Sequence, residues 1–188
     1  VMILKDALEV VENKEGDHAI VFSSSGIAIP GDSKDNLCCK AYYLIKEHHA
    51  LPTIKIHLHK HIPIGAGLGG GSSDAAFCIR LLNEKFNLRL STSEMHDYAS
   101  KLGSDCAFFI NNEPVFAEGT GTIFSPVSIR LKGYYITLVY PNIHVNTAKA
   151  YQGVVPKKPT RNLLDDVTKL PIEQWKKALS NRKTGYDL

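Results

Sequence analysis

The sequence predicts a mixed α+β fold, because strand-like and helix-like segments occur together without strict alternation. Residues 54–59 alternate apolar and polar side chains, which is typical of a strand with one buried face. Residues 91–94 have the spacing of a helix capping box, and Gly103 follows where that helix should end. A doubly wound parallel sheet would instead show a regular succession of strand and helix.

The other elements are predicted from similar local signals, in chain order. Residues 18–23 are expected to form a strand, and Asp35 is expected to cap the helix that follows. The apolar face of that helix would hold Leu37, Ala41, Leu44 and Ile45. A helix is expected from Ala75 to about Glu84, after a glycine-rich segment. Later segments are predicted as strands at 115–117, 122–124 and 134–140 and as a short helix at 171–179 with proline at its start.

Composition limits the possible classes of protein. The chain has 188 residues, 44% of them hydrophobic and 22% charged, which suffices for one domain and part of a second. A net charge of +3 does not call for nucleic acid or a membrane as a partner, and no apolar run is long enough to span a bilayer. The four cysteines lack metal or disulfide spacing, which predicts free thiols in a reducing cytoplasm. We expect a cytoplasmic monomer or homodimer.

The glycine-rich segment at 63–76 is the strongest functional signal in the sequence. Five of the seven residues from 65 to 71 are glycine. Glycines leave backbone N–H groups uncovered and permit positive φ, so the chain can curl around an anion, and a helix start adds further donors. The segment lacks the lysine of a Walker A loop, and its match to a dinucleotide fingerprint lacks an acidic ribose partner. We interpret it as a triphosphate-binding loop; the alternative is a flexible loop without a ligand.

This segment is similar to the ATP motif of the GHMP kinases. The Gly-Gly-Gly-Ser-Ser version, preceded by Lys60-His-Ile-Pro63, most resembles the 4-diphosphocytidyl-2-C-methyl-D-erythritol kinases, as do residues 35–37, 102–109 and 116–121. The resemblance implies a GHMP kinase N-terminal domain (ribosomal S5 domain 2-like) with a left-handed β-α-β unit. It also implies ATP and Mg²⁺ as cofactors, and diphosphocytidyl methylerythritol as a small-molecule substrate phosphorylated on its 2-hydroxyl.

The resemblance also implies roles for individual residues. Ser72 would contact Mg²⁺, and Tyr151 would stack on the cytosine ring, although an ordinary half-buried tyrosine is an equal alternative. For Lys60 and Asn36 the alternatives are a surface lysine and a helix-start asparagine. The nucleotide would be bound by Asn36, Leu37, Lys60, Pro63, Gly65, Gly67, Leu68, Gly69, Gly70, Gly71, Ser72 and Ser73.

Asp105 is the candidate general base. It follows the helix-ending Gly103 and precedes an apolar segment that we interpret as a strand, so its carboxylate would lie at the edge of a core. It also aligns with the catalytic aspartate of the family; a turn-forming aspartate is the alternative. Asp74 is interpreted as a first-turn acid favoured by the helix dipole. The alternating His57, His59 and His61 are interpreted as a solvent-facing row on a strand rather than a zinc site.

The domain organisation is predicted from the same resemblance. Residues 1–155 would be the ATP-binding domain without its first strands, and 156–188 a linker and the start of a second α+β domain. Residues 181–188 are interpreted as part of that domain, as a misplaced fragment or as an added tail. The lysine that the family places beside its catalytic aspartate is not found, and Lys5 is not that lysine. Alternatives are another GHMP kinase with a mevalonate- or homoserine-type acceptor, an inactive ATP-binding regulator, and a non-catalytic S5-like RNA-binding module.

Overall fold

The computed structural model describes residues 4–14, 19–129, 131–140, 152, 155 and 163–175. The chain divides into two compact units, one of residues 1–113 and 117–124 and the other of residues 114–116 and 125–188. The glycine-rich segment and Asp105 both belong to the first unit, whereas Tyr151 lies outside the described residues.

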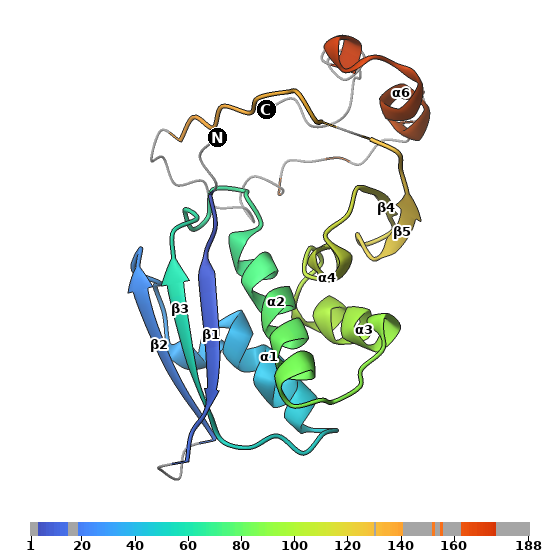
Figure 1. Cartoon of the computed structure of the whole chain (residues 1–188). Helices are drawn as coiled ribbons and strands as arrows, with labels where there is room; N and C mark the ends of the chain where they lie inside the picture. The colour runs from blue at the N-terminus through green and yellow to red at the C-terminus, as the bar shows by residue number, and fades with distance from the viewer. Residues whose placement is uncertain are drawn as a thin grey trace. The chain divides into compact units, whose positions relative to one another are not determined.

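A three-stranded sheet in the order β1-β3-β2 forms one layer of the first unit (Figure 1). Its strands are β1 (Ala7–Glu12), β2 (Ile20–Gly26) and β3 (Ile54–Lys60). The central strand β3 runs antiparallel to β1 and parallel to β2. The predicted strands at 54–59 and, with shifted ends, at 18–23 are therefore confirmed.

The helices of the first unit lie on one face of this sheet (Figure 1). They are α1 (Leu37–Lys46), α2 (Gly70–Lys85), α3 (Thr92–Leu102) and the short α4 (Phe108–Asn111), with a 3₁₀ turn at Ser33–Asp35 before α1. The strands β2 and β3 and the helix α1 between them form a parallel β-α-β unit. Between the sheet and the helices lies an apolar core, and all four cysteines are buried and free, as predicted.

Side-chain capping explains where two of these helices begin, and packing explains the start of a third. The side chain of Asn36, not of Asp35 as predicted, caps α1 by accepting from Cys38 N–H at 2.9 Å. Ser91 and Glu94 form the predicted capping box of α3, which ends at Gly103. The helix α2 begins at Gly70, five residues before the predicted start. Gly70 packs within the fold at this position, and such tertiary packing outweighs the low helix propensity of glycine.

A short hairpin follows the helical layer. Its strands β4 (Val115–Glu118) and β5 (Ile123–Pro126) pair with each other, as predicted from 115–117 and 122–124. The apolar segment after Asp105 is not a strand as predicted, because residues 108–111 form the helix α4. A run of aromatic and apolar residues this short suits either conformation, so its periodicity could not decide between them.

The second unit contains less regular structure among the residues described. The predicted strand at 134–140 is wrong: these residues are irregular and mostly exposed, since no described strand pairs with them. A helix α6 (Leu163–Lys169) precedes residues 172–175, which are helical after Pro171 as predicted. Within the part of the chain that the structure describes, none of the helices combines the length and the apolar character that crossing a membrane requires.

Candidate active site

The glycine-rich loop connects the end of β3 to the start of α2. Gly65, Gly67 and Gly69 have φ values of 70°, 71° and 67°, in the left-handed region that residues with a Cβ rarely adopt. The first hydrogen bond of the helix runs from Ser73 N–H to the Gly69 carbonyl at 2.8 Å. The N–H groups of the residues just before Ser73 therefore have no acceptor within the helix, and the positive end of its dipole lies with them. This arrangement suits an anion such as a phosphate.

The glycines of this loop differ in what surrounds them. A Cβ on Gly69 would lie 3.0 Å from the Phe109 ring, and a Cβ on Gly70 would lie 2.9 Å from Ile62 Cγ2. In contrast, nothing lies within 4 Å of a Cβ built on Gly67 or Gly71. The loop is therefore packed against the protein at Gly69 and Gly70, and at Gly67 and Gly71 a ligand can approach the backbone closely.

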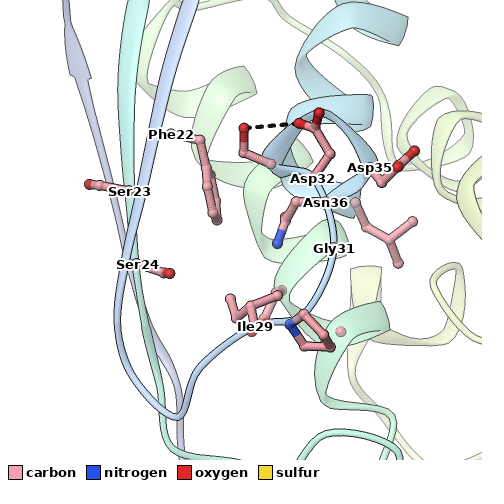
Figure 2. A pocket seen from close by; sticks show the side chains of 13 residues that line it. Phe22, Ser23, Ser24, Ile29, Gly31, Asp32, Asp35 and Asn36 are labelled. Atoms are coloured by element: carbon pink, nitrogen blue, oxygen red, sulfur yellow. Dashed lines mark hydrogen bonds between the residues drawn. The ribbon is translucent and has the colours of Figure 1, made fainter.

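Two adjoining cavities lie beside the loop. One of about 310 Å³ is lined by residues 63–72 together with Asn36, Leu37 and Lys60. The other, of about 390 Å³, is bordered by Phe22 and by the segment before α1, and Figure 2 shows its side chains, Asn36 among them. Both cavities are lined by Ile29, Asn36, Leu37, Gly71 and Asp74. Small-molecule sites occupy about 300–1,000 Å³, so the two cavities together suit an elongated ligand with an anionic end at the glycines.

A buried cluster of charges lies next to the loop. The Lys60 ammonium lies 2.5 Å from Asp6 Oδ2 and 2.7 Å from Asp74 Oδ2. Burial raises the pKa of Asp74 to about 6; the charge of Asp6 adds to this effect and Lys60 opposes it. Burial alone would lower the pKa of Lys60, but its hydrogen bonds to the two carboxylates raise it. Asp74 is thus not the dipole-favoured acid predicted from sequence, because its carboxylate is buried in ion pairs.

Asp105 lies in the turn between α3 and α4. It is exposed, and the Ser104 hydroxyl donates to its Oδ1 over 3.3 Å. The next residue along the chain lies against the start of α2: burial raises the pKa of the Cys106 thiol, and a hydrogen bond with Ser72 partly offsets this. The structure therefore brings the turn that carries Asp105 close to the glycine-rich loop.

The histidine row lies on the face of the sheet opposite to the helices. His57 contacts the hydroxyls of Ser23 and Ser25 through its two ring nitrogens, both at 2.9 Å, and His59 Nδ1 contacts Ser25 at 2.9 Å. Among the residues described, no group of three or more His, Cys, Asp or Glu side chains could hold a metal ion. His57 and His59 thus lie on the strand as interpreted from sequence, partly and fully exposed, whereas His61 is exposed but lies beyond the end of β3.

Sequence reasoning did not identify Asp6 as part of this region. Asp6 accepts from the backbone N–H groups of His61 and Ile62, at 2.6 and 2.8 Å, as well as from Lys60. One signal pointed to Lys60 as unusual, because it continues the buried side of the alternation through Ile56 and Leu58. No pattern in the sequence indicated that Asp6 is its partner.

The class of protein follows from comparison with known families. Residues 36–113 match the model of the GHMP kinases N terminal domain. This stretch holds Asn36, the glycine-rich loop and Asp105. The chain therefore contains a GHMP kinase N-terminal domain, as the resemblance and the α+β fold predicted.

Particular relatives narrow the comparison. The chain is 47% identical over 178 residues to a 4-diphosphocytidyl-2-C-methyl-D-erythritol kinase of Bacteroides fragilis, covering 95% of this chain and 65% of that protein. It is 51% identical over 177 residues to the kinase of the same name from Cytophaga hutchinsonii, covering 94% of this chain and 64% of that protein. The chain thus spans just under two thirds of the length of these relatives.

Solved structures give the same result for the fold. A crystal structure of 4-(cytidine 5'-diphospho)-2C-methyl-D-erythritol kinase matches with a TM-score of 0.62 and 27% identity, covering 88% of this chain and 59% of the other. A homoserine kinase from Cytophaga hutchinsonii matches with a TM-score of 0.58 at 15% identity, covering 92% of this chain and 56% of the other. The second likeness concerns the fold alone.

Proposed function

We propose that this chain is the nucleotide-binding part of an ATP-dependent kinase that phosphorylates the 2-hydroxyl of 4-diphosphocytidyl-2-C-methyl-D-erythritol. The observation that carries the proposal is 47% identity, over 95% of this chain, to a relative of that name. The glycine-rich loop supports it, since open space at Gly67 and Gly71 and the donors at the start of α2 suit a triphosphate. The four buried thiols support the expected cytoplasmic location.

The loop would hold the phosphates of ATP through its backbone. The residues proposed to contact the nucleotide are Pro63, Gly65, Gly67, Leu68, Gly69, Gly70, Gly71, Ser72 and Ser73. Asn36 and Leu37 would contact the rest of the nucleotide, because both line the two adjoining cavities. Fixed N–H donors cost little reorganisation as charge develops on the transferred group, which is the main contribution a protein makes to phosphoryl transfer.

The side chains near the loop fit a magnesium ion. Mg²⁺ prefers hard oxygen ligands, and the Ser72 hydroxyl and the Asp105 carboxylate are oxygen donors on adjacent segments. When bound, the ion would neutralise charge on the β- and γ-phosphates. Ser72 is the proposed protein ligand. Tyr151 stays the proposed cytosine-stacking residue of the acceptor site.

Asp105 would accept the proton of the acceptor hydroxyl. An exposed carboxylate is accessible to a substrate, and its neighbour Cys106 lies against Ser72 at the start of α2. The Ser104 hydroxyl bond to Oδ1 leaves Oδ2 available for the acceptor. A general base of this kind contributes about 10²–10⁴-fold to rate.

Substitution of Asp105 tests this role. Asp105→Asn should lower kcat by about 100-fold or more, as for loss of a general base, with the Kd for ATP nearly unchanged. The measurement is steady-state turnover combined with titration calorimetry of ATP. Asp97→Asn, at an exposed position of α3 outside the site, is the matched control. Unchanged turnover in Asp105→Asn would exclude Asp105 as the base.

A turnover assay tests the whole proposal. ATP consumption by the protein is measured in the presence of Mg²⁺ with 4-diphosphocytidyl-2-C-methyl-D-erythritol as the acceptor. Mevalonate and homoserine are tested as acceptors in parallel. Turnover with the diphosphocytidyl compound alone is the expected result. Turnover with either rival acceptor would keep the kinase class and overturn the substrate, and absence of ATP binding would overturn both.

A further inference from the structure

Three charged side chains from distant parts of the sequence meet beneath the glycine-rich loop. Asp6 precedes β1, Lys60 ends β3 and Asp74 lies in α2; we call them the charge cluster. Their side chains are 5%, 4% and 8% exposed, respectively. Removing such groups from water is costly unless the charges are paired and hydrogen-bonded, and in this cluster all three charges are paired and hydrogen-bonded.

The cluster holds both ends of the loop. At the first end, Asp6 Oδ1 accepts from the N–H groups of His61 and Ile62, the first residues of the loop. At the second end, Lys60 donates to Asp74, which is fixed in the second turn of α2. Because Asp6 Oδ2 also accepts from Lys60, one continuous set of hydrogen bonds links the end of β3, the start of the loop and the helix.

The ammonium of Lys60 also packs against the first residue of α2. A Cβ at Gly70 would lie 3.0 Å from Lys60 Nζ and 2.9 Å from Ile62 Cγ2. The φ of Gly70 is not positive, so its backbone conformation does not require glycine. A small residue is required here because Lys60 and Ile62 lie close to the backbone. The start of α2 is therefore packed against both Lys60 and Ile62.

The same contacts engage two of the three N–H donors of the ammonium, which leaves little of it for a phosphate. Lys60 is among the residues lining the loop cavity, but its Nζ is directed to two carboxylates and only 4% of the side chain is exposed. Turning the ammonium towards ATP would weaken its bonds to the two buried carboxylates, and a buried charge that loses its partner is strongly destabilising. The lysine is thus better placed to hold the loop than to bind the ligand.

We propose that Lys60 is a positioning residue for nucleotide binding: paired with Asp6 and Asp74, it fixes the loop and the start of α2 so that their N–H groups are arranged before ATP arrives. The proposal rests on the proposed ATP site. Preorganised donors lose less freedom on binding, so loss of the cluster weakens affinity even though no ligand contact is removed.

The test uses the double variant Lys60→Met/Asp74→Asn. This pair removes the lysine without leaving an unpaired charge in α2, and Asp6 keeps its two backbone donors, so the protein remains folded as judged by circular dichroism. The expected result is a Kd for ATP at least tenfold higher than wild type, measured by titration calorimetry. Lys55→Met, an exposed lysine of the same strand, is the matched control with the wild-type Kd.

Amide hydrogen exchange of the ligand-free protein separates this proposal from that of the ATP site. Faster exchange of residues 61–72 in the double variant, with β1 and α3 unchanged, is expected. If wild type fails to bind ATP but this local difference in exchange is found, the ATP site is wrong and the holding role of the cluster stands. Wild-type ATP affinity, or wild-type exchange in the loop, in the folded double variant would overturn the positioning role.

Discussion

Polar side chains on one face of strand β3 are partly or fully exposed, whereas the polar side chain on the other face is buried. On the face turned away from the helices, His57 and His59 share hydrogen bonds with serines of the neighbouring strand, and Lys55 is exposed. On the other face, Ile54, Ile56 and Leu58 are at most 1% exposed, and Lys60 continues their row at 4%.

This difference shows that the location of a polar group matters more than its number of hydrogen bonds. A hydrogen bond between partly hydrated groups contributes about 0.5–1.5 kcal/mol, because water can replace either partner. Water cannot replace the partners of a buried ammonium, so Lys60 holds the carboxylates of Asp6 and Asp74 in place. Substitutions on the face that is richer in polar residues should therefore change the stability less than substitutions on the buried face.

Removing one lysine charge from each face in turn should give the largest difference in the free energy of unfolding. Lys60→Met leaves Asp6 and Asp74 buried together without their cation, and we expect a loss of about 3–5 kcal/mol in the free energy of unfolding. Lys55→Met on the exposed face should change it by less than about 0.5 kcal/mol. Urea unfolding monitored by circular dichroism measures both. Equal effects for the two lysines would remove the distinction between the faces.

Two adjacent glycines at the start of α2 provide a second comparison between a packed and an open position. Gly70→Ala places a methyl group against Ile62 and the fixed Lys60 ammonium, and overpacking of this kind costs about 1–3 kcal/mol. Gly71→Ala meets nothing within 4 Å and should stabilise the helix by about 0.5–1 kcal/mol, while its methyl group obstructs the proposed phosphates. Thermal unfolding and ATP titration of both variants provide the test, and a stabilising Gly70→Ala would show that the packing is loose.

The pH dependence of stability gives a smaller expected effect than the substitution of Lys60. The pKa of Asp74 is raised from 3.8 to about 6 in the folded state, so this group favours folding when protonated, and its contribution is lost as pH rises through about 6. Asp74→Asn lacks this titration. Its free energy of unfolding relative to wild type should therefore be higher at pH 7 than at pH 5, by about 1 kcal/mol. A pH-independent difference in urea unfolding between the two proteins would contradict the raised pKa.

Features of the fold could be predicted from the sequence when they depend on residues that are close together in the chain. The strand β3 and the capping box of α3 were correct because alternation and capping are set by neighbours within a few residues. The glycine-rich loop was identified because its composition is unusual for a structural segment. The early start of α2 was missed because the contacts that hold its glycines, such as Gly69 with Phe109, come from elsewhere in the fold.

Long-range partners could not be predicted from local patterns. Lys60 and Asp6 are 54 residues apart, and nothing in the segment around Asp6 distinguishes it from an ordinary exposed acid. The apolar run at 134–140 has strong strand propensity, but a strand also needs a partner, and none of the described strands pairs with it. The helix before Asp105 ends at Gly103 as predicted, but the segment after Asp105 forms the helix α4 and not the predicted strand.

The order of strands in the sheet has a consequence for how the chain folds. Strands β1 and β2 are consecutive in sequence, yet among the described strands each pairs only with β3, whose last residue is 60. Until β3 is synthesised, a nascent chain therefore lacks the neighbour that β1 and β2 share in this sheet, and closing such long loops slows folding. The glycine-rich loop follows β3 directly, so the proposed nucleotide site forms after the sheet, and a nucleotide bound there would stabilise the completed sheet but could not nucleate it.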